Sequence, residues 1–171
     1  MTAKKATTTK SSIKSTTENK TTAKAIKKAP VKKIQAANPI EVLKNAKTIL
    51  LVDWPDKDVP LVLLKAGFMV ISYSPDKYTL LSYETNYAED KLVFSDLEGP
   101  PGQVEIVNVF RPEEEHEEII NRHGIPLKAK TIWLHPPVTS AKTAKLAEKH
   151  KFNFVEEHDI VVTAAELSAK K

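Results

Sequence analysis

The chain has 171 residues, 41% hydrophobic and 28% charged, which is enough apolar material for one domain of ordinary size. It has no cysteine, which excludes a disulfide scaffold, a thiolate metal site and a cysteine nucleophile. The longest apolar runs, near Thr48–Val52 and Phe68–Tyr73, are far shorter than the roughly 20 residues that span a bilayer.

Residues 1–38 form a lysine-rich segment that we predict to be a disordered tail. They hold ten lysines and one acid, Glu18, a balance of +9, and no aromatic residue. Such a segment cannot bury enough apolar area to offset the entropy of ordering it. No apolar stretch follows its basic start, so we expect no signal peptide and a cytoplasmic protein.

Two interpretations of this tail stay open. Lysines among Ala, Thr and Pro can bind nucleic acid or another polyanion by counterion release, without reading its sequence. The tail could instead be a solvated segment that aids solubility or touches the body. The body, residues 39–171, has 16 Lys and Arg against 21 Asp and Glu, a balance of −5.

The body opens with a predicted βαβ unit. Residues 47–52 (KTILLV) predict a buried strand, and residues 68–73 (FMVISY) predict a second one. Between them we expect a helix that is capped by Asp58, tolerates Pro60 in its first turn and ends at Gly67. Such a unit implies parallel strands and a right-handed crossover.

The alternation of strand and helix patterns continues after a less clear stretch, residues 76–102. The predicted strands are residues 91–94, 104–110 and 131–134. The predicted helices run from Pro112 to Gly124 and from a cap at Thr139 or Ser140 to about His150. The apolar runs 152–155 and 160–162 close the pattern. We therefore predict an α/β fold with a Rossmann-like, doubly wound, mostly parallel sheet.

Ligands of such sheets bind outside the carboxyl ends of the strands. This rule selects four loops without any motif search. They are residues 53–58, 73–77, 110–112 and 135–140.

Four short segments in a fixed order carry a family resemblance. They are Ala66-Gly67 after the first helix, Ser74-Pro75 after the second strand, residues 107–112 (VNVFRP) and residues 132–135 (IWLH). Over about residues 46–162 the chain resembles the small single-domain CoA-binding proteins with a Rossmann-like fold. These are related to the CoA-binding domain of the succinyl-CoA synthetase α subunit.

The resemblance implies CoA or acyl-CoA as the ligand, lying over the first loop and the start of the first helix. The implied cofactor site takes residues from the selected loops and the start of the first helix: Asp53, Trp54, Pro55, Asp56, Val59, Ser74, Pro75, Lys77, Phe110, Arg111 and His135.

The first loop departs from the family pattern. The family usually has Gly and small residues there, so that backbone N–H groups can approach a pyrophosphate. Here Asp53 would repel a phosphate, Trp54 is bulky and Pro55 lacks an N–H. His135 and two prolines also stand where the family favours Gln and a Gly-containing turn. The fold resemblance is therefore stronger than the ligand resemblance.

Several of these side chains have two interpretations each. Trp54 could stack on an adenine ring or plug the cleft. Lys57 and Lys77 could pair with phosphates or be ordinary exposed lysines. Arg111 could hold a phosphate or carboxylate bidentately, or bridge to a nearby acid and fix the loop. His135 could act as a general acid or base, or be a hydrogen-bonded loop histidine.

No metal site is predicted. His116 and His123 lie seven residues apart among five glutamates, which is not the i, i+4 spacing of a helical zinc site. We predict a solvated acidic face there.

Three functional hypotheses follow. The first is a non-catalytic CoA or acyl-CoA binding protein, because no residue set for acyl transfer is evident and the ligase relatives need a further domain and a phosphorylated histidine segment. The second is a Rossmann-like interaction scaffold that has lost cofactor binding. The third is a protein associated with chromatin or RNA through residues 1–38.

Overall fold

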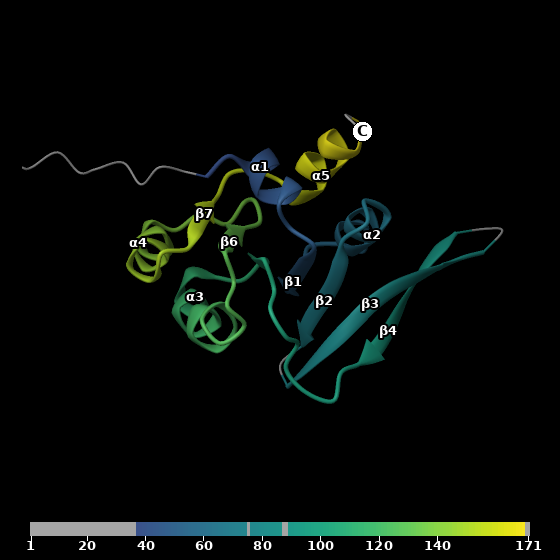
Figure 1. Ribbon diagram of the computed structural model, residues 1–171, viewed down its shortest axis with the longest axis horizontal. Helices are drawn as coiled ribbons and strands as arrows, with labels where there is room; N and C mark the ends of the chain where they lie inside the picture. Colours follow the sequence, from purple (N-terminus) through teal and green to yellow (C-terminus); the bar gives the residue numbers. More distant parts are fainter. Residues whose placement is uncertain (1–36, 75, 87–88, 170–171) are drawn as a thin grey trace, which may run out of the picture. The chain divides into compact units, whose positions relative to one another are not determined.

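One mixed sheet organises the part of the computed structural model that is described, residues 37–74, 76–86 and 89–169 (Figure 1). In chain order the elements are α1 (Pro39–Lys44), β1 (Thr48–Val52), α2 (Asp58–Lys65), β2 (Met69–Ser74), β3 (Lys77–Thr85), β4 (Asp90–Asp96), β5 (Ile106–Val109), α3 (Glu113–Ile119), the π-helix η1 (Ile120–Gly124), β6 (Thr131–Leu134), α4 (Ala141–His150), β7 (Asn153–Val155) and α5 (Ile160–Ala169).

The sheet has seven strands in the order β4-β3-β2-β1-β5-β6-β7. The strands β2, β1, β5, β6 and β7 are mutually parallel, and β3 and β4 add an antiparallel hairpin at one edge. The chain order reverses direction between β1 and β5, which is the switch point of a doubly wound sheet. The predicted α/β, Rossmann-like, mostly parallel fold is confirmed.

Both faces of the sheet are covered by helices, so its central strands are apolar on both sides. On one face, Ile49 and Leu51 of β1 pack with side chains of α1, α2 and α5. On the other, Leu50 and Val52 pack with side chains of α3, η1 and α4. Figure 1 shows α1 beside α5 and, apart from them, α3 beside α4. The sheet therefore lies between two helical layers.

The first βαβ unit is formed as predicted, except at the helix cap. Gly67 has φ +92°, the left-handed conformation in which glycine ends a helix without strain. Asp58 is the first helical residue rather than the cap. Its backbone N–H donates to the Asp56 carboxylate at 2.8 Å, so the acid two residues earlier satisfies this end of α2.

The antiparallel hairpin is the main part of the sheet that the sequence pattern missed. Strand β3 was not predicted, and β4 is longer than the predicted strand at residues 91–94. Side chains become exposed along β3 beyond Leu81, so the far half of this strand lacks the apolar alternation of a half-buried strand.

Two helix starts are set by acid or hydroxyl caps. Ser140, one of the two candidates, caps α4 by accepting from the backbone N–H of Thr143 at 3.0 Å. The apolar run 160–162 begins α5, and Asp159 accepts from the N–H of Val161 at 2.7 Å. Within the described ranges, no helix is both long and apolar enough to cross a bilayer.

The predicted tail, residues 1–38, lies outside the described residues except for its last two. Of these, Asn38 caps α1 by accepting from the N–H of Ile40 at 3.0 Å. The domain boundary near Asn38–Pro39 stays a prediction.

Candidate functional site

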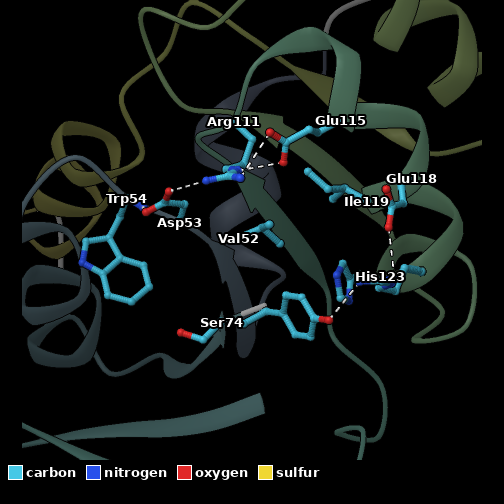
Figure 2. Close-up of a pocket in the computed structure, with 11 residues that line it drawn as sticks. Val52, Asp53, Trp54, Ser74, Arg111, Glu115, Glu118, Ile119 and His123 are labelled. Atoms are coloured by element: carbon cyan, nitrogen blue, oxygen red, sulfur yellow. Dashed lines mark hydrogen bonds and ion pairs between the residues drawn. The ribbon is translucent and has the colours of Figure 1, made fainter. Parts of the chain in front are cut away.

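A pocket of about 320 Å³ opens at the carboxyl ends of β1 and β2, on the face covered by α3 and η1 (Figure 2). We call it the strand-end pocket. Its lining comes from three segments far apart in the sequence: Val52, Asp53 and Trp54; Tyr73 and Ser74; and Arg111, Glu115, Glu118, Ile119, Arg122 and His123. Four predicted site residues, Asp53, Trp54, Ser74 and Arg111, are thus brought together.

Arg111 is the central charge of this pocket. Its Nε and Nη2 donate to the two carboxylate oxygens of Glu115 at 2.9 and 3.2 Å, and its Nη1 donates to Asp53 at 3.1 Å. Figure 2 shows the guanidinium between these two acids. The hydrogen bonds to Glu115 and then to Asp53 raise the pKa of Arg111. Of the two interpretations of Arg111, the structure therefore shows the bridge to nearby acids.

Asp53 fixes the loop that follows β1. It has φ +65°, a left-handed conformation that costs a residue with a Cβ roughly 1 kcal/mol or more. One carboxylate oxygen accepts from the backbone N–H of Trp54 at 2.9 Å, and the other pairs with Arg111. The loop is thus held by an acid at the position where the family pattern favours a small residue.

A second arginine stands on the π-helix. Arg122 donates to the Tyr73 hydroxyl at 3.1 Å and pairs with Glu118 at 3.0 Å. Its side chain is 51% exposed, and that of Arg111 is 42% exposed. Both guanidinium groups are therefore accessible from solvent as well as tied to carboxylates.

His123 forms the inner wall of the pocket beside Arg122. It is 1% exposed, its Nδ1 lies 2.8 Å from the Tyr78 hydroxyl, and its ring centre lies 4.2 Å from that of Tyr73. Burial, and then the nearby Arg122 charge, lower the pKa of His123 to about 4. Burial also raises the pKa of Tyr78. The imidazole is therefore neutral at pH 7.

The predicted solvated acidic face is formed by the exposed Glu113, Glu114, Glu117 and Glu118, but the two histidines do not lie on it, because both are buried. His116 is 1% exposed, donates from Nε2 to the Arg111 carbonyl at 2.8 Å, and pairs through Nδ1 with the Thr143 hydroxyl at 2.6 Å. Positions 116, 119, 120 and 123 share one helical stripe that faces the sheet. Among the described residues, no group of three or more potential ligands could hold a metal ion.

The start of α2 does not offer a free cradle for a pyrophosphate. The N–H groups of Asp58 and Val59 already donate to the side chain and the carbonyl of Asp56. Pro55 has no N–H, and Asp56 adds a negative charge at the helix end. Pro55 and Asp56 face a different cavity, of about 450 Å³, between the first loop and β4. The residues present at α2 thus do not fit this part of CoA.

The other predicted site residues lie outside the strand-end pocket. Val59 is buried in the core, and Lys77 pairs with Asp96 at 2.7 Å on the hairpin. Phe110 packs edge-on against the ring of His135, with centroids 5.7 Å apart. The Nζ of Lys57 lies 3.8 Å from the Oε2 of Glu89. Pro75 lies outside the described residues.

The pocket residues that the sequence interpretation did not assign to the site come from the last residue of β1, from β2 and from the predicted helix 112–124. They are Val52, Tyr73, which lies in a selected loop, Glu115, Glu118, Ile119, Arg122 and His123. The available signal was the spacing i, i+3, i+4, i+7 of positions 116, 119, 120 and 123, which predicts one buried helix face. The run of glutamates made this helix look solvent-exposed.

Comparisons with known proteins agree with this fold. A protein from Thermus thermophilus, cell-free ID.343, superposes with a TM-score of 0.57 at 19% identity, covering 77% of this chain and 99% of its own. Prb, described as the PH1109 protein redesigned for binding, gives 0.58 at 18% identity, covering 78% and 92%. Another structure, of an uncharacterized protein, gives 0.50 at 14% identity, covering 72% and 97%. At these identities the likeness shows the fold alone.

Among curated proteins, none matches this sequence significantly. A family profile described as CoA binding domain matches residues 54–164. This match spans the first loop, both arginines of the strand-end pocket and strands β2 to β7. The chain therefore belongs to the CoA-binding domain family.

Proposed function

We propose that the protein binds CoA or an acyl-CoA without transforming it, and that the anionic part of the ligand occupies the strand-end pocket. The observation that carries this proposal is the pair of accessible guanidinium groups, Arg111 and Arg122, in one cavity at the carboxyl ends of the parallel strands. Ligands of doubly wound sheets bind at this edge. A pocket of about 320 Å³ suits part of a CoA-sized ligand.

The two arginines retain capacity for a phosphate. A guanidinium has five N–H donors, and the described partners of Arg111 engage three of them. A phosphate would share each guanidinium with its carboxylates and meet repulsion from Asp53, Glu115 and Glu118. We therefore expect moderate, salt-sensitive affinity.

The state of the ionisable groups supports a non-catalytic role. His123 is neutral at pH 7 and bound to Tyr78, and its pKa of about 4 is far from that of an effective general base. The carboxylates of Asp53 and Glu115 are tied to Arg111. In this arrangement the polar groups hold the pocket together.

The second candidate is a scaffold that has lost CoA binding. The occupied amides at the start of α2 favour it, because Asp56 takes the place that a phosphate would fill. Nucleic-acid binding through residues 1–38 is a separate prediction. A salt-dependent DNA mobility shift that disappears when these residues are deleted would support it.

Calorimetric titration of CoA and acetyl-CoA into the full chain tests the main proposal. We expect micromolar binding at one site per chain, weakened about tenfold or more in Arg111→Gln and in Arg122→Gln, because each loses charge-assisted bonds. The matched control is Lys142→Gln, since Lys142 also pairs with a glutamate but does so outside the pocket, with Glu117 at 3.3 Å. No binding at millimolar ligand by a chain shown to be folded would overturn the proposal and favour the scaffold.

A further inference from the structure

The two outermost strands of the sheet are protected to different degrees. Strand β7 has only three residues, and its Phe154 carbonyl accepts from the backbone N–H of Ala37 at 3.2 Å. Strand β4 has seven residues and lies on the outer side of the hairpin, where β3 is its only partner among the described strands (Figure 1). A long, open outer strand attracts another strand, because its free backbone groups need partners.

The hydrogen bonds at the two ends of the hairpin show which backbone groups of β4 point outward. The N–H of Leu97 donates to the Tyr78 carbonyl at 3.0 Å, and that of Asn86 donates to the Glu89 carbonyl at 3.2 Å. In an antiparallel ladder, bonded pairs alternate with pairs that are not bonded, and here the register runs unbroken from residue 79 to residue 85. The odd-numbered residues of β4 therefore bond to β3, and the even-numbered ones direct their N–H and C=O groups away from it.

Apolar side chains accompany these open backbone groups. Phe94 is 54% exposed and stands opposite the buried Leu81 of β3, so it lies on the face of the sheet that α2 covers. Phe94 and Leu92 also line the cavity of about 450 Å³ between the first loop and β4, together with Leu61 of α2. Strand β4 has neither a proline nor a bulge, and its central residues 92–95 (LVFS) carry no charge. The usual devices that block pairing are thus missing from the middle of this strand.

A second copy of β4 fits this strand in an antiparallel arrangement. A two-fold axis through Val93, perpendicular to the sheet, places Leu92 opposite the partner's Phe94, and Phe94 opposite the partner's Leu92. Both residues are even-numbered, so each pair can exchange N–H···O bonds in both directions. The paired side chains share one face, where an aromatic ring beside an aliphatic group is favourable.

The charges at the two ends of β4 are compatible with this pairing. The same axis brings Asp90 opposite the partner's Asp96, and each of these acids already has a lysine. Lys65 pairs with Asp90, and Lys77 pairs with Asp96 at 2.7 Å. Two lysines and two acids would therefore meet at each end of the contact without net charge, so the opposed acids do not repel the second copy.

We propose that two copies of the chain associate through β4, as an antiparallel strand pair centred on Val93 that joins their sheets into one. The contact is self-complementary and closes as a two-fold dimer. Strand pairing alone buries less surface than a standard stable interface, so we expect a dissociation constant on the order of 10–100 µM. The inference does not depend on the proposed function, because no residue of β4 lines the strand-end pocket.

Sedimentation velocity of the full chain over a range of concentrations tests the association. We expect a monomer at about 1 µM and mostly dimer at about 500 µM. Phe94→Lys should weaken the dimer about tenfold or more, because it removes the ring and puts a charge in the middle of the contact. The matched control is Met69→Lys. Met69 is also 54% exposed but begins β2, inside the sheet, so this change should leave the dissociation constant as it is.

Disulfide trapping tests the register, and the chain suits it because it has no cysteine of its own. In a pair centred on Val93, the two Val93 Cα atoms lie about 4.5 Å apart, which a disulfide can bridge. Val93→Cys should therefore give a covalent dimer on mild oxidation, seen on a non-reducing gel. The matched control is Ser95→Cys, on the same face of β4, whose two copies would stand roughly 14 Å apart and should stay unlinked.

The other outcomes overturn the proposal. A chain that stays monomeric throughout would exclude a second copy and leave β4 open to an extended segment of another protein. A dimer that Phe94→Lys and Met69→Lys affect equally would form through another surface. Equal linking of the two cysteine variants, or none in either, would contradict the pairing centred on Val93. If Phe94→Lys does not fold, Phe94→Thr takes its place, because threonine suits a strand.

Discussion

The two faces of the sheet edge at the carboxyl ends of the parallel strands accommodate polar side chains in opposite ways. On the α3 side, the strand-end pocket gathers charged groups that are about half exposed and that neutralise one another, as Arg111 does with Asp53 and Glu115. On the α2 and α5 side, Asn108 and His135 are buried and uncharged, and three of their atoms have no hydrogen-bond partner among the described residues.

This difference shows which face bears the larger energetic cost. Exposed ion pairs contribute little to stability, so a surface can keep or lose them at small cost. A buried polar group without a partner costs about 1–3 kcal/mol. A substitution at Asn108 should therefore change stability more than a substitution of one exposed ion-pair partner in the strand-end pocket.

The largest expected effect concerns His123, which is buried like Asn108 but lies in the charged pocket. Its pKa is about 4 in the folded protein against 6.5 for the free side chain, so the unfolded chain binds more protons between these values. Its contribution to the free energy of unfolding is fully present above pH 6.5 and is lost as the pH falls toward 4. The total is roughly 3 kcal/mol.

Urea unfolding of the wild type and of His123→Gln at a series of pH values measures this contribution. Glutamine can still bond to Tyr78 but does not titrate. We expect the variant to have a flatter pH dependence between pH 6.5 and 4, whereas His150→Gln, at the end of α4, should follow the wild type. Parallel curves for the wild type and His123→Gln would show that His123 does not carry the effect.

The second prediction concerns the buried pair. Asn108→Leu should raise the free energy of unfolding by about 1–3 kcal/mol, because it removes two unpaired atoms from an apolar setting. Asn108→Asp should instead lower it, because a buried charge without a partner is unfavourable. Denaturant titrations measure both. A less stable Asn108→Leu protein would mean that the amide is satisfied in solution, and the contrast between the two faces would weaken.

The sequence predicts the parallel half of the sheet well because its signals are local. Residues 47–52, 68–73 and 131–134 are short apolar runs between turn residues, and Gly67 marks a helix end. Strand β3 has polar side chains along its exposed half, so no local pattern identifies it. It is held by pairing with β2 and β4, which are contacts that a pattern along one segment does not show.

The lining of the strand-end pocket was predictable where it follows from the strand ends. Asp53, Ser74 and Arg111 were selected by that rule and line the pocket. Arg122 was not selected, because it meets Tyr73 from 49 residues away and stands on a π-helix that no sequence pattern indicated. The lack of a hydrogen-bond partner for Asn108 among the described residues is likewise evident only from the structure, because the sequence shows no more than an asparagine in a predicted strand.

A smaller effect on stability is expected for Asp53→Gly. Glycine adopts φ +65° without strain but has more entropy to lose on folding, and the exposed pair with Arg111 disappears. The free energy of unfolding should therefore change by less than about 1 kcal/mol. CoA affinity should rise about fivefold to tenfold, because one acid beside Arg111 is gone. Calorimetry measures the affinity, with Asp96→Asn on the hairpin as the control. Weaker binding would show that the ligand needs Asp53.

The smallest expected effect concerns Lys77, to which the family resemblance gives a ligand contact. The structure pairs Lys77 with Asp96 at 2.7 Å, but the two side chains are 56% and 63% exposed. Solvent screens such a pair, so Lys77→Ala should change the free energy of unfolding by less than about 0.5 kcal/mol. CoA affinity should also stay the same, because Lys77 does not line the strand-end pocket. A fall in affinity would place an anionic group of the ligand at the start of the hairpin, beside Lys77, and the charged face of the sheet edge would then lose its assigned role.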